Sequence, residues 1–150
     1  MTGFARFLLG LAVLMPLAAE AQTAAPQDAY LYLISPREGQ KVRGPITVRF
    51  GLRNMGVTRA GDTTANVGHH HLLVDTDATS LPPGEPIPTD RKHLHFGGGQ
   101  TETTLELSPG KHTLQLVLGD AEHKLFNPPV VGKKINLTVL PPIVERTSRR

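Results

Sequence analysis

The chain has 150 residues, of which 39% are hydrophobic and 5% aromatic, and its formal net charge at pH 7 is +3. This length suits one domain rather than two. The sequence has no Cys, which excludes disulfides, thiolate metal ligands and a cysteine nucleophile. It has seven His, and all of them fall between His69 and His123.

Residues 1–21 have the pattern of a secretory signal peptide. A basic residue, Arg6, precedes an apolar run over 7–17, and a small-x-small motif ends at Ala21. The alternative is a membrane anchor, which needs about 20 apolar residues, whereas this run contains Pro16 and ends early. We therefore expect cleavage after Ala21, a periplasmic or secreted protein, and no stable membrane insertion after cleavage.

The rest of the chain divides into three parts. The composition of residues 22–29 predicts a disordered leader, residues 30–140 a single domain, and residues 141–150 a basic C-terminal tail. The excess of basic residues is small, and the few aromatic residues are not interleaved with it in the way that base stacking requires. Nucleic acid is therefore not an expected partner.

Short apolar and β-branched segments, separated by turn residues, recur along the domain. Residues 46–52 alternate apolar and polar side chains with the period of a strand, and no segment has an apolar stripe of helical period. Residues 79–88 are too rich in Pro for a helix or a paired strand. We expect strands at 30–34, 46–52, 70–74, 93–96, 101–107, 111–118 and 135–139.

This spacing predicts an all-β fold, an immunoglobulin-like antiparallel β-sandwich of about seven short strands. A small β-barrel is the alternative. Because aromatic residues are few, the interior is expected to consist mainly of Leu, Val and Ile.

The histidines can be sorted by strand face. Side chains alternate along a strand, so His69 and His71 project to one face while His70 projects to the other. His93 and His95 repeat the same spacing and also share a face. Each of these pairs has a geometry that can share a metal ion.

Two further histidines follow in the second half of the domain. His112 shares the apolar face of the strand over 111–118. Two interpretations are equally favoured there, a metal ligand and a hydrogen-bonded structural histidine. His123 lies in the loop after that strand, and loops at one end of a sandwich converge. We therefore expect His123 to approach the start of the strand that carries His69.

Imidazole is the commonest protein ligand for zinc, copper and nickel, and a set of nitrogen ligands without sulfur favours Cu(II) or Zn(II) over Cu(I). A structural polar network with nearby carboxylates is the alternative. The sequence does not favour an enzyme, because no nucleophile with a base and no carboxylate pair stands at a suitable spacing. The candidate metal ligands are His69, His71, His93, His95, His112 and His123, of which His69, His71, His95 and His123 form the leading set.

An ordered series of motifs runs through the domain: residues 68–75, 93–102 and 107–116, followed by Gly119, Asp120 and His123. With these motifs the chain resembles a bacterial secreted family, domain of unknown function 4399, from about Tyr30 to Val139. The resemblance implies a small exported β-domain rich in His and implies no activity.

Two other classes are similar in part. Small periplasmic copper-carrier sandwiches use a His at the mature N-terminus, where this chain has Gln22. The pair His69 and His71, followed by Asp75, is similar to the first cupin motif, which has Glu at the acidic position. We therefore expect a periplasmic module that binds copper or zinc. The alternatives are an interaction domain with structural histidines, whose partner is another envelope protein, and a small cupin-like metalloenzyme.

Overall fold

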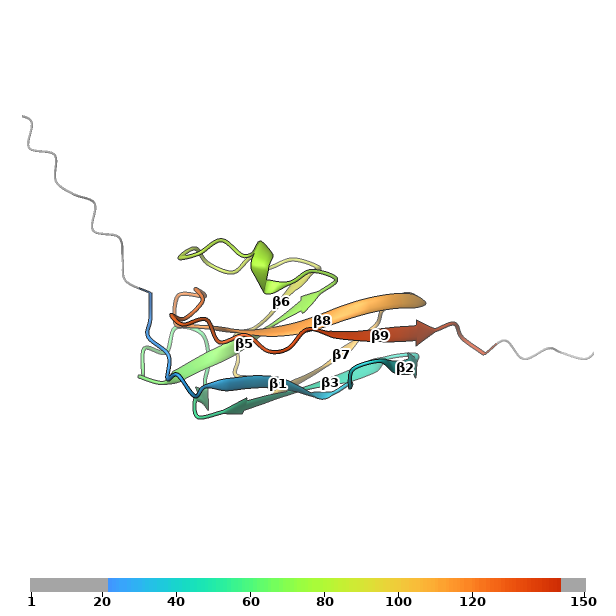
Figure 1. Ribbon diagram of the computed structural model, residues 1–150, viewed down its shortest axis with the longest axis horizontal. Coiled ribbons are helices and arrows are strands. Elements are labelled where there is room, and N and C mark those ends of the chain that lie inside the picture. The colour runs from blue at the N-terminus through green and yellow to red at the C-terminus, as the bar shows by residue number, and fades with distance from the viewer. Residues whose placement is uncertain (1–21, 144–150) are drawn as a thin grey trace, which may run out of the picture.

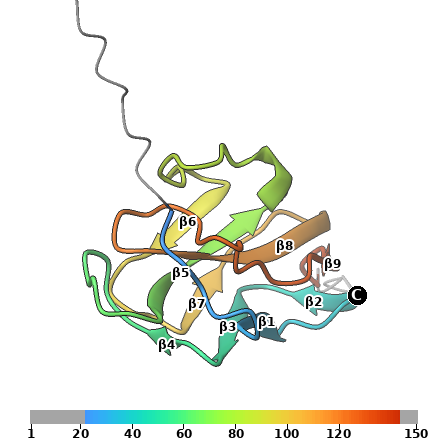
Figure 2. The ribbon, with the colours of Figure 1, turned by 60° about the vertical axis from the view of Figure 1, so that its left-hand side comes forward.

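The computed structural model describes residues 22–143, so the expected signal peptide and residues 144–150 of the tail lie outside the described residues. Two β-sheets pack face to face, as Figures 1 and 2 show. The elements are β1 (Tyr30–Ser35), β2 (Gln40–Arg43), β3 (Ile46–Arg53), β4 (Gly56–Val57), β5 (Val67–Val74), the 3₁₀ helix η1 (Ala78–Ser80), β6 (His93–Phe96), β7 (Glu102–Leu105), β8 (Gly110–Gly119) and β9 (Ile135–Leu140).

The expected all-β sandwich is confirmed, with one difference in the pairing. One sheet has the order β1-β3-β7, and the other has the order β2-β9-β8-β5-β4 with β6 also paired to β5. The long strands pair antiparallel, whereas β2 pairs with β9 and β4 with β5 in parallel. All seven expected strands are present. The two additional strands, β2 and β4, are short and mostly exposed, so they carry no apolar alternation.

The Pro-rich segment contains no named strand, as expected, but a 3₁₀ helix overlaps its first two residues. The carboxylate of Asp77 accepts a hydrogen bond from the Thr79 backbone N–H and so caps this turn. The turn ends before Pro82 is reached. Local capping therefore stabilises a single turn that composition alone did not indicate.

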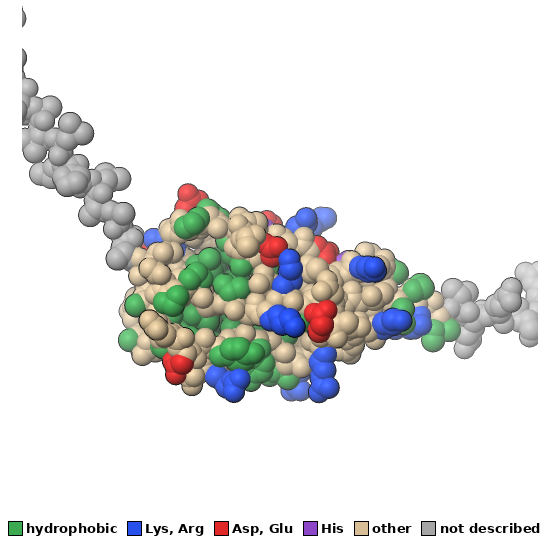
Figure 3. Space-filling model, viewed as in Figure 1, with side chains coloured by type: hydrophobic (Ala, Val, Ile, Leu, Met, Phe, Trp, Pro, Cys, Tyr) green, Lys and Arg blue, Asp and Glu red, His purple; other side chains and the backbone are tan. Residues whose placement is uncertain are grey.

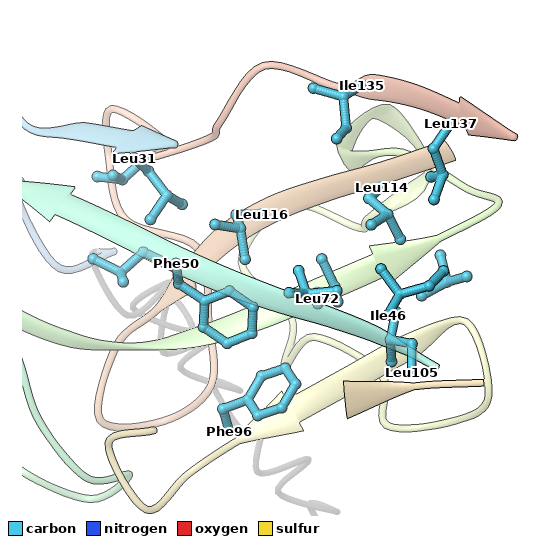
Figure 4. Packing of buried hydrophobic residues seen from close by; sticks show 14 of the residues in the cluster. Leu31, Ile46, Phe50, Leu72, Phe96, Leu105, Leu114, Leu116, Ile135 and Leu137 are labelled. Atoms are coloured by element: carbon cyan, nitrogen blue, oxygen red, sulfur yellow. The ribbon is translucent and has the colours of Figure 1, made fainter. Parts of the chain in front are cut away.

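The main core lies between the two sheets. Alternate residues of β5 and β8, such as Leu72 and Leu116, face Val48 and Phe50 of β3, and all four are at most 3% exposed. Figure 4 shows the side chains of Phe50, Leu72 and Leu116 pointing into the space between the strands. The phenyl rings of Phe50 and Phe96 pack edge to face, with centroids 4.9 Å apart. Burial of each such apolar side chain contributes about 1.5–3 kcal/mol, so this core stabilises the sandwich.

The other face of β5 and β8 is also covered. The connection over 75–92 folds back across the outer side of the larger sheet, away from β1 and β3 (Figures 1 and 2). It packs there together with the segment that follows β8. This second cluster consists of Leu73, Leu81, Ile87, Val117 and Leu125. The larger sheet is therefore buried on both faces in this region, and the side chains on its outer face are enclosed separately from the main core.

Residues 22–29 differ from the disordered leader that composition predicts. The backbone N–H of Asn127 donates to the carbonyl of Thr23 over 2.9 Å, and that of Ala25 donates to the carbonyl of Asn127 over 3.3 Å. The segment thus forms a short parallel bridge with the chain after β8. Composition does not reveal such a bridge, because the hydrogen-bonding groups belong to the backbone of a distant segment.

The face seen in Figure 3 shows hydrophobic side chains gathered on one half, and Lys and Arg mostly toward the end at which β9 finishes. Very little histidine surface is visible, which fits the complete burial of His69, His70 and His71. No helix within residues 22–143 is long and apolar enough to cross a membrane.

Candidate metal centre

The triple histidine in β5 is divided between the two faces of the strand, as its alternation predicts. His70 lies on the inner face with Leu72, whereas His69 and His71 lie on the outer face with Leu73. All three imidazoles have zero exposure. The outer pair is therefore enclosed between the sheet and the loops that cover it, in an environment separate from the main core.

Four imidazoles meet on this outer face: His69 and His71 from β5, His95 from β6 and His123 from the loop after β8. We call them the His cluster. The centroids of His69, His95 and His123 form a nearly equilateral triangle with sides of 5.0, 5.0 and 4.8 Å. One ligand atom from each of these three lies within 4.8 Å of the others. His71 is 4.9 Å from both His69 and His95, but 6.2 Å from His123.

Strand pairing brings three of the rings together. In the antiparallel register of β5 and β6, His71 stands directly opposite His95. On the other edge of β5, His69 stands opposite Gly119, the last residue of β8. Directly opposed residues on one face have Cβ atoms about 4.5–5.5 Å apart, which is the separation that adjacent imidazoles need. The loop that follows Gly119 then supplies His123.

A buried carboxylate organises that loop. Asp120 is 4% exposed, and its Oδ1 accepts hydrogen bonds of 2.9 Å from the backbone N–H groups of Glu122 and Lys124. Its Oδ2 accepts a hydrogen bond of 2.6 Å from the hydroxyl of Thr23. A charged acceptor makes such bonds stronger than neutral ones. Asp120 is therefore a structural support for the loop, and it holds the N-terminal segment against it.

His123 itself is fixed at both backbone groups. Its N–H donates to the carbonyl of Asp120 over 3.0 Å, and its carbonyl accepts from the N–H of Ile87 over 2.7 Å. His123 has a φ of 66°, in the left-handed region that few residues other than Gly adopt and in which Asn, Asp and His are the commonest of those few. The Pro-rich connection and the loop after β8 thus jointly hold the ring of His123 over β5.

Two glycines allow the rings to lie against the backbone. A Cβ added at Gly119 would lie 2.8 Å from Nε2 of His71 and 3.2 Å from Nε2 of His69. A Cβ added at Gly97 would lie 2.6 Å from Nε2 of His95. The distances to His95 and His71 are shorter than 3.0 Å, which real Cβ atoms essentially never show, and the distance to His69 is tighter than most real Cβ contacts. At Gly119 the backbone is also fixed by its pairing with β5. Glycine is therefore a requirement of this ring packing.

Three members of the His cluster, His69, His71 and His95, favour the neutral form. Burial is the main cause that lowers the pKa of His69 to about 4 and that of His71 to about 3, and the neighbouring imidazoles lower both further. The pKa of His95 is also lowered, first by burial and then by His123. A neutral imidazole keeps one lone pair, and this lone pair is the group that binds a metal ion.

Several nitrogens in the cluster have no hydrogen-bond partner. Nε2 of His69 and Nε2 of His71 are 3.0 Å apart and hydrogen-bond to each other. Within the described residues no partner exists for the buried Nδ1 of His69, Nδ1 of His71 or Nε2 of His95. Buried polar atoms are nearly always paired, so three unpaired nitrogens in one cluster call for a ligand or water.

The structure does not bring His93 and His112 into the cluster. Nδ1 of His93 is 2.9 Å from a carboxylate oxygen of Asp90. His112 has both ring nitrogens engaged, with Nδ1 2.8 Å from Oδ2 of Asp75 and Nε2 2.8 Å from the carbonyl of Ser108. Burial opposes the charged form of His112, but these two hydrogen bonds outweigh it and raise the pKa. The acid of the cupin-like motif, Asp75, thus pairs with His112 and not with the cluster.

The roles of several residues at or near the site were not predicted. His70 is buried beside the core, where its Nδ1 donates to the carbonyl of Gln100 over 3.1 Å and its ring lies 5.1 Å from that of Phe50. The roles of Asp120 and Thr23 depend on contacts between segments far apart in the chain, for which the sequence has no signal. In the sequence Gly119 stands out only as a position of the family motif after the strand over 111–118.

The fold and the site define a small β-sandwich that carries a buried cluster of imidazoles on the outer face of one sheet. A family model described as Domain of unknown function (DUF4399) matches residues 48–140. The chain belongs to this family. The matched range includes all four members of the His cluster and leaves out β1 and β2. Comparisons with curated proteins and with solved structures gave no match.

Proposed function

We propose that this protein is an exported metal-binding module that holds one copper or zinc ion in the His cluster. The observation that carries the proposal is the convergence of imidazoles from β5, β6 and the loop after β8. A metal ion of this type is bound by nitrogen at about 2.0–2.1 Å. The ligand atoms of His69, His95 and His123 therefore need to draw together by only a small adjustment of their side chains.

The hydrogen-bond inventory favours a metal centre over a structural network. His112 is an example of a structural histidine in the same protein, since a partner lies at each of its nitrogens. His69, His71 and His95 each keep a buried nitrogen without one. Leaving a buried polar group unpaired costs about 1–3 kcal/mol, so three of them together would be a substantial penalty. Metal coordination would use the lone pair of each of these nitrogens that carries no proton, and would so reduce that cost.

The ligand set supports copper or zinc as the ion. The His cluster supplies imidazole nitrogen and no sulfur, because the chain has no Cys. The buried carboxylate of Asp120 is already occupied by two backbone N–H groups and a hydroxyl. Neutral imidazoles are typical ligands of Cu(II) and Zn(II), whereas calcium and magnesium prefer oxygen.

The proposed location is the periplasm, and its support is the sequence of residues 1–21 with its basic start, apolar run and small-x-small motif. Fractionation of cells, together with N-terminal sequencing of the mature protein, tests this part. A mature chain that begins at Gln22 in the periplasmic fraction is expected. An uncleaved chain in the cytoplasm would contradict it.

The metal is tested with protein purified without a His tag and titrated with Cu(II) and Zn(II). We expect one ion per chain for the wild type and loss of this binding in His69→Ala/His95→Ala. His93→Ala is the matched control, because it removes the other histidine of the β6 pair, whose ring is held by Asp90. A wild type that binds neither ion, with its circular dichroism spectrum intact, would refute a metal function and leave the interaction domain with structural histidines.

A further inference from the structure

We propose that three imidazoles, His69, His95 and His123, bind the metal ion, and that the fourth coordination position is open to a small anion from solution. This inference rests on the proposed function and makes it more specific. It assigns His71 a different task, namely to orient His69 through a hydrogen bond. The site would then be an exchangeable-ligand centre and not a closed structural one.

The arrangement of the rings separates His71 from the other three. His69, His95 and His123 are almost equidistant, with centroids 4.8–5.0 Å apart, and their ligand atoms form one compact group. His71 is 6.2 Å from His123, so it does not complete a regular four-membered set around the same centre. The ring of His71 instead contacts only two members of the triangle, His69 and His95, each at a centroid distance of 4.9 Å.

The contact between His69 and His71 fits the role of an orienting partner. Of two neutral imidazoles that hydrogen-bond, one donates and the other accepts. When Nε2–H of His69 donates to Nε2 of His71 over 3.0 Å, the lone pair of His69 is on Nδ1, which is buried and has no protein partner. A histidine that binds a metal through one nitrogen almost always donates its other N–H to a hydrogen-bond acceptor, and His71 would be that acceptor here.

Within residues 22–143 no other His, Asp or Glu joins the compact group of ligand atoms from His69, His95 and His123. Both carboxylate oxygens of Asp120 are engaged by Thr23, Glu122 and Lys124. His69 and His71 are fully buried, whereas His95 and His123 are only partly buried, so the side of the triangle nearest to solvent is the one formed by the latter two. Three neutral imidazoles leave the charge of a divalent ion uncompensated in this enclosed site, which favours an anion as the exogenous ligand.

The test uses the full mature protein loaded with one equivalent of Cu(II), with azide as the probe anion. We expect an azide-to-copper charge-transfer band that grows to saturation as azide is added. Electron paramagnetic resonance should report three imidazole nitrogens before and after azide binding. His71→Gln, which keeps a hydrogen-bond acceptor, should retain one copper per chain and the azide band, whereas His95→Ala should lose copper.

The result that would overturn the open coordination position differs from the result that would refute the proposed metal function. Four imidazole nitrogens in the wild type, with no azide band until His71 is replaced, would overturn the open position and establish a closed four-histidine site. A wild type without stoichiometric copper would refute the proposed function itself, and this is known before azide is added. The principal measurements use the wild type, so they stand even where His71→Gln does not fold.

Discussion

The hydroxyl of Thr23 donates a hydrogen bond of 2.6 Å to the carboxylate of Asp120, and this bond joins the N-terminal segment to the loop that carries His123. The two residues are 97 positions apart in the chain. Asp120 holds the loop closed through two backbone N–H groups, so its other oxygen connects the geometry of His123 to a segment outside the sheets.

Replacement of Thr23 by Val should therefore weaken metal binding without abolishing it. The change removes a hydrogen bond to a charged group, worth about 1.5–3 kcal/mol. Part of this loss of free energy should reach the metal site, because the loop that carries His123 is then held less firmly. We expect the dissociation constant for Cu(II) to rise about three- to tenfold. Calorimetric titration measures it. Thr79→Val is the matched control, because the hydroxyl of Thr79, in η1, also donates to a carboxylate, that of Asp77, which is not part of the His cluster. Equal effects of the two variants would count against the connection.

Gly119→Ala should impair the His cluster directly. The new methyl group would lie 2.8 Å from Nε2 of His71 and 3.2 Å from Nε2 of His69, and the paired strands leave no room to retreat. Crowding of this kind costs about 1–3 kcal/mol, and metal binding should weaken by tenfold or more because both rings must turn. Gly98→Ala is the control, since its methyl group would meet only the flexible side chain of Gln100. Unchanged copper affinity in Gly119→Ala would show that the rings adapt freely.

The metal-free protein should lose stability as the pH falls from 7 to 5. In the unfolded chain His69 and His71 take up protons near pH 6.5, whereas burial lowers their pKa in the folded chain to about 4 and about 3. The unfolded state therefore binds more protons in this window, and the free energy of unfolding should fall by roughly 2–4 kcal/mol. Urea titrations in the presence of a chelator measure it.

His112 should change the free energy of unfolding with pH in the opposite direction to His69 and His71, so the two effects can be measured separately. Its pKa is raised in the folded state, so the stabilisation it supplies is present below pH 6.5 and lost as the pH rises through the folded value.

The variant His71→Gln tests whether the His cluster causes the loss of stability between pH 7 and 5. In His71→Gln the acid-induced loss of stability should be smaller than in the wild type. A stability curve of His71→Gln that parallels the wild type would contradict the assignment of this loss to the cluster.

His112→Ala should lower stability and leave metal stoichiometry unchanged. The ring bridges the carboxylate of Asp75 and the carbonyl of Ser108, and its loss should cost about 1–3 kcal/mol. Thermal unfolding and metal analysis of the same sample measure the two quantities. Combining His112→Ala with Asp75→Asn should give less than the sum of the two single effects, because the residues share one interaction. Loss of the bound ion in His112→Ala would instead make His112 a ligand.

Strand periodicity was sufficient to predict most of the fold and the faces of the triple histidine. The alternation over β3 and over β5 depends only on local geometry, so it can be recognised in the sequence. The meeting of His95 with His71 depends on the register between β5 and β6, and Asp120 acquires its role from Thr23 at the other end of the chain. The leading set of His69, His71, His95 and His123, chosen from strand alternation and loop position, is the set that the structure brings together. The long-range pairings themselves have no local pattern, so the sequence kept His93 and His112 as further candidate ligands.

The division of β5 between its two faces also bears on how this protein can change. His69 and His71 contact the cluster, whereas Leu72 and Val74, on the opposite face, belong to the main core. Substitutions at 69 and 71 should therefore act on the His cluster with little direct effect on the packing between the sheets. Under the function proposed above, the preference for one ion over another could then change by substitutions on one face of β5 while the core on its other face stays the same.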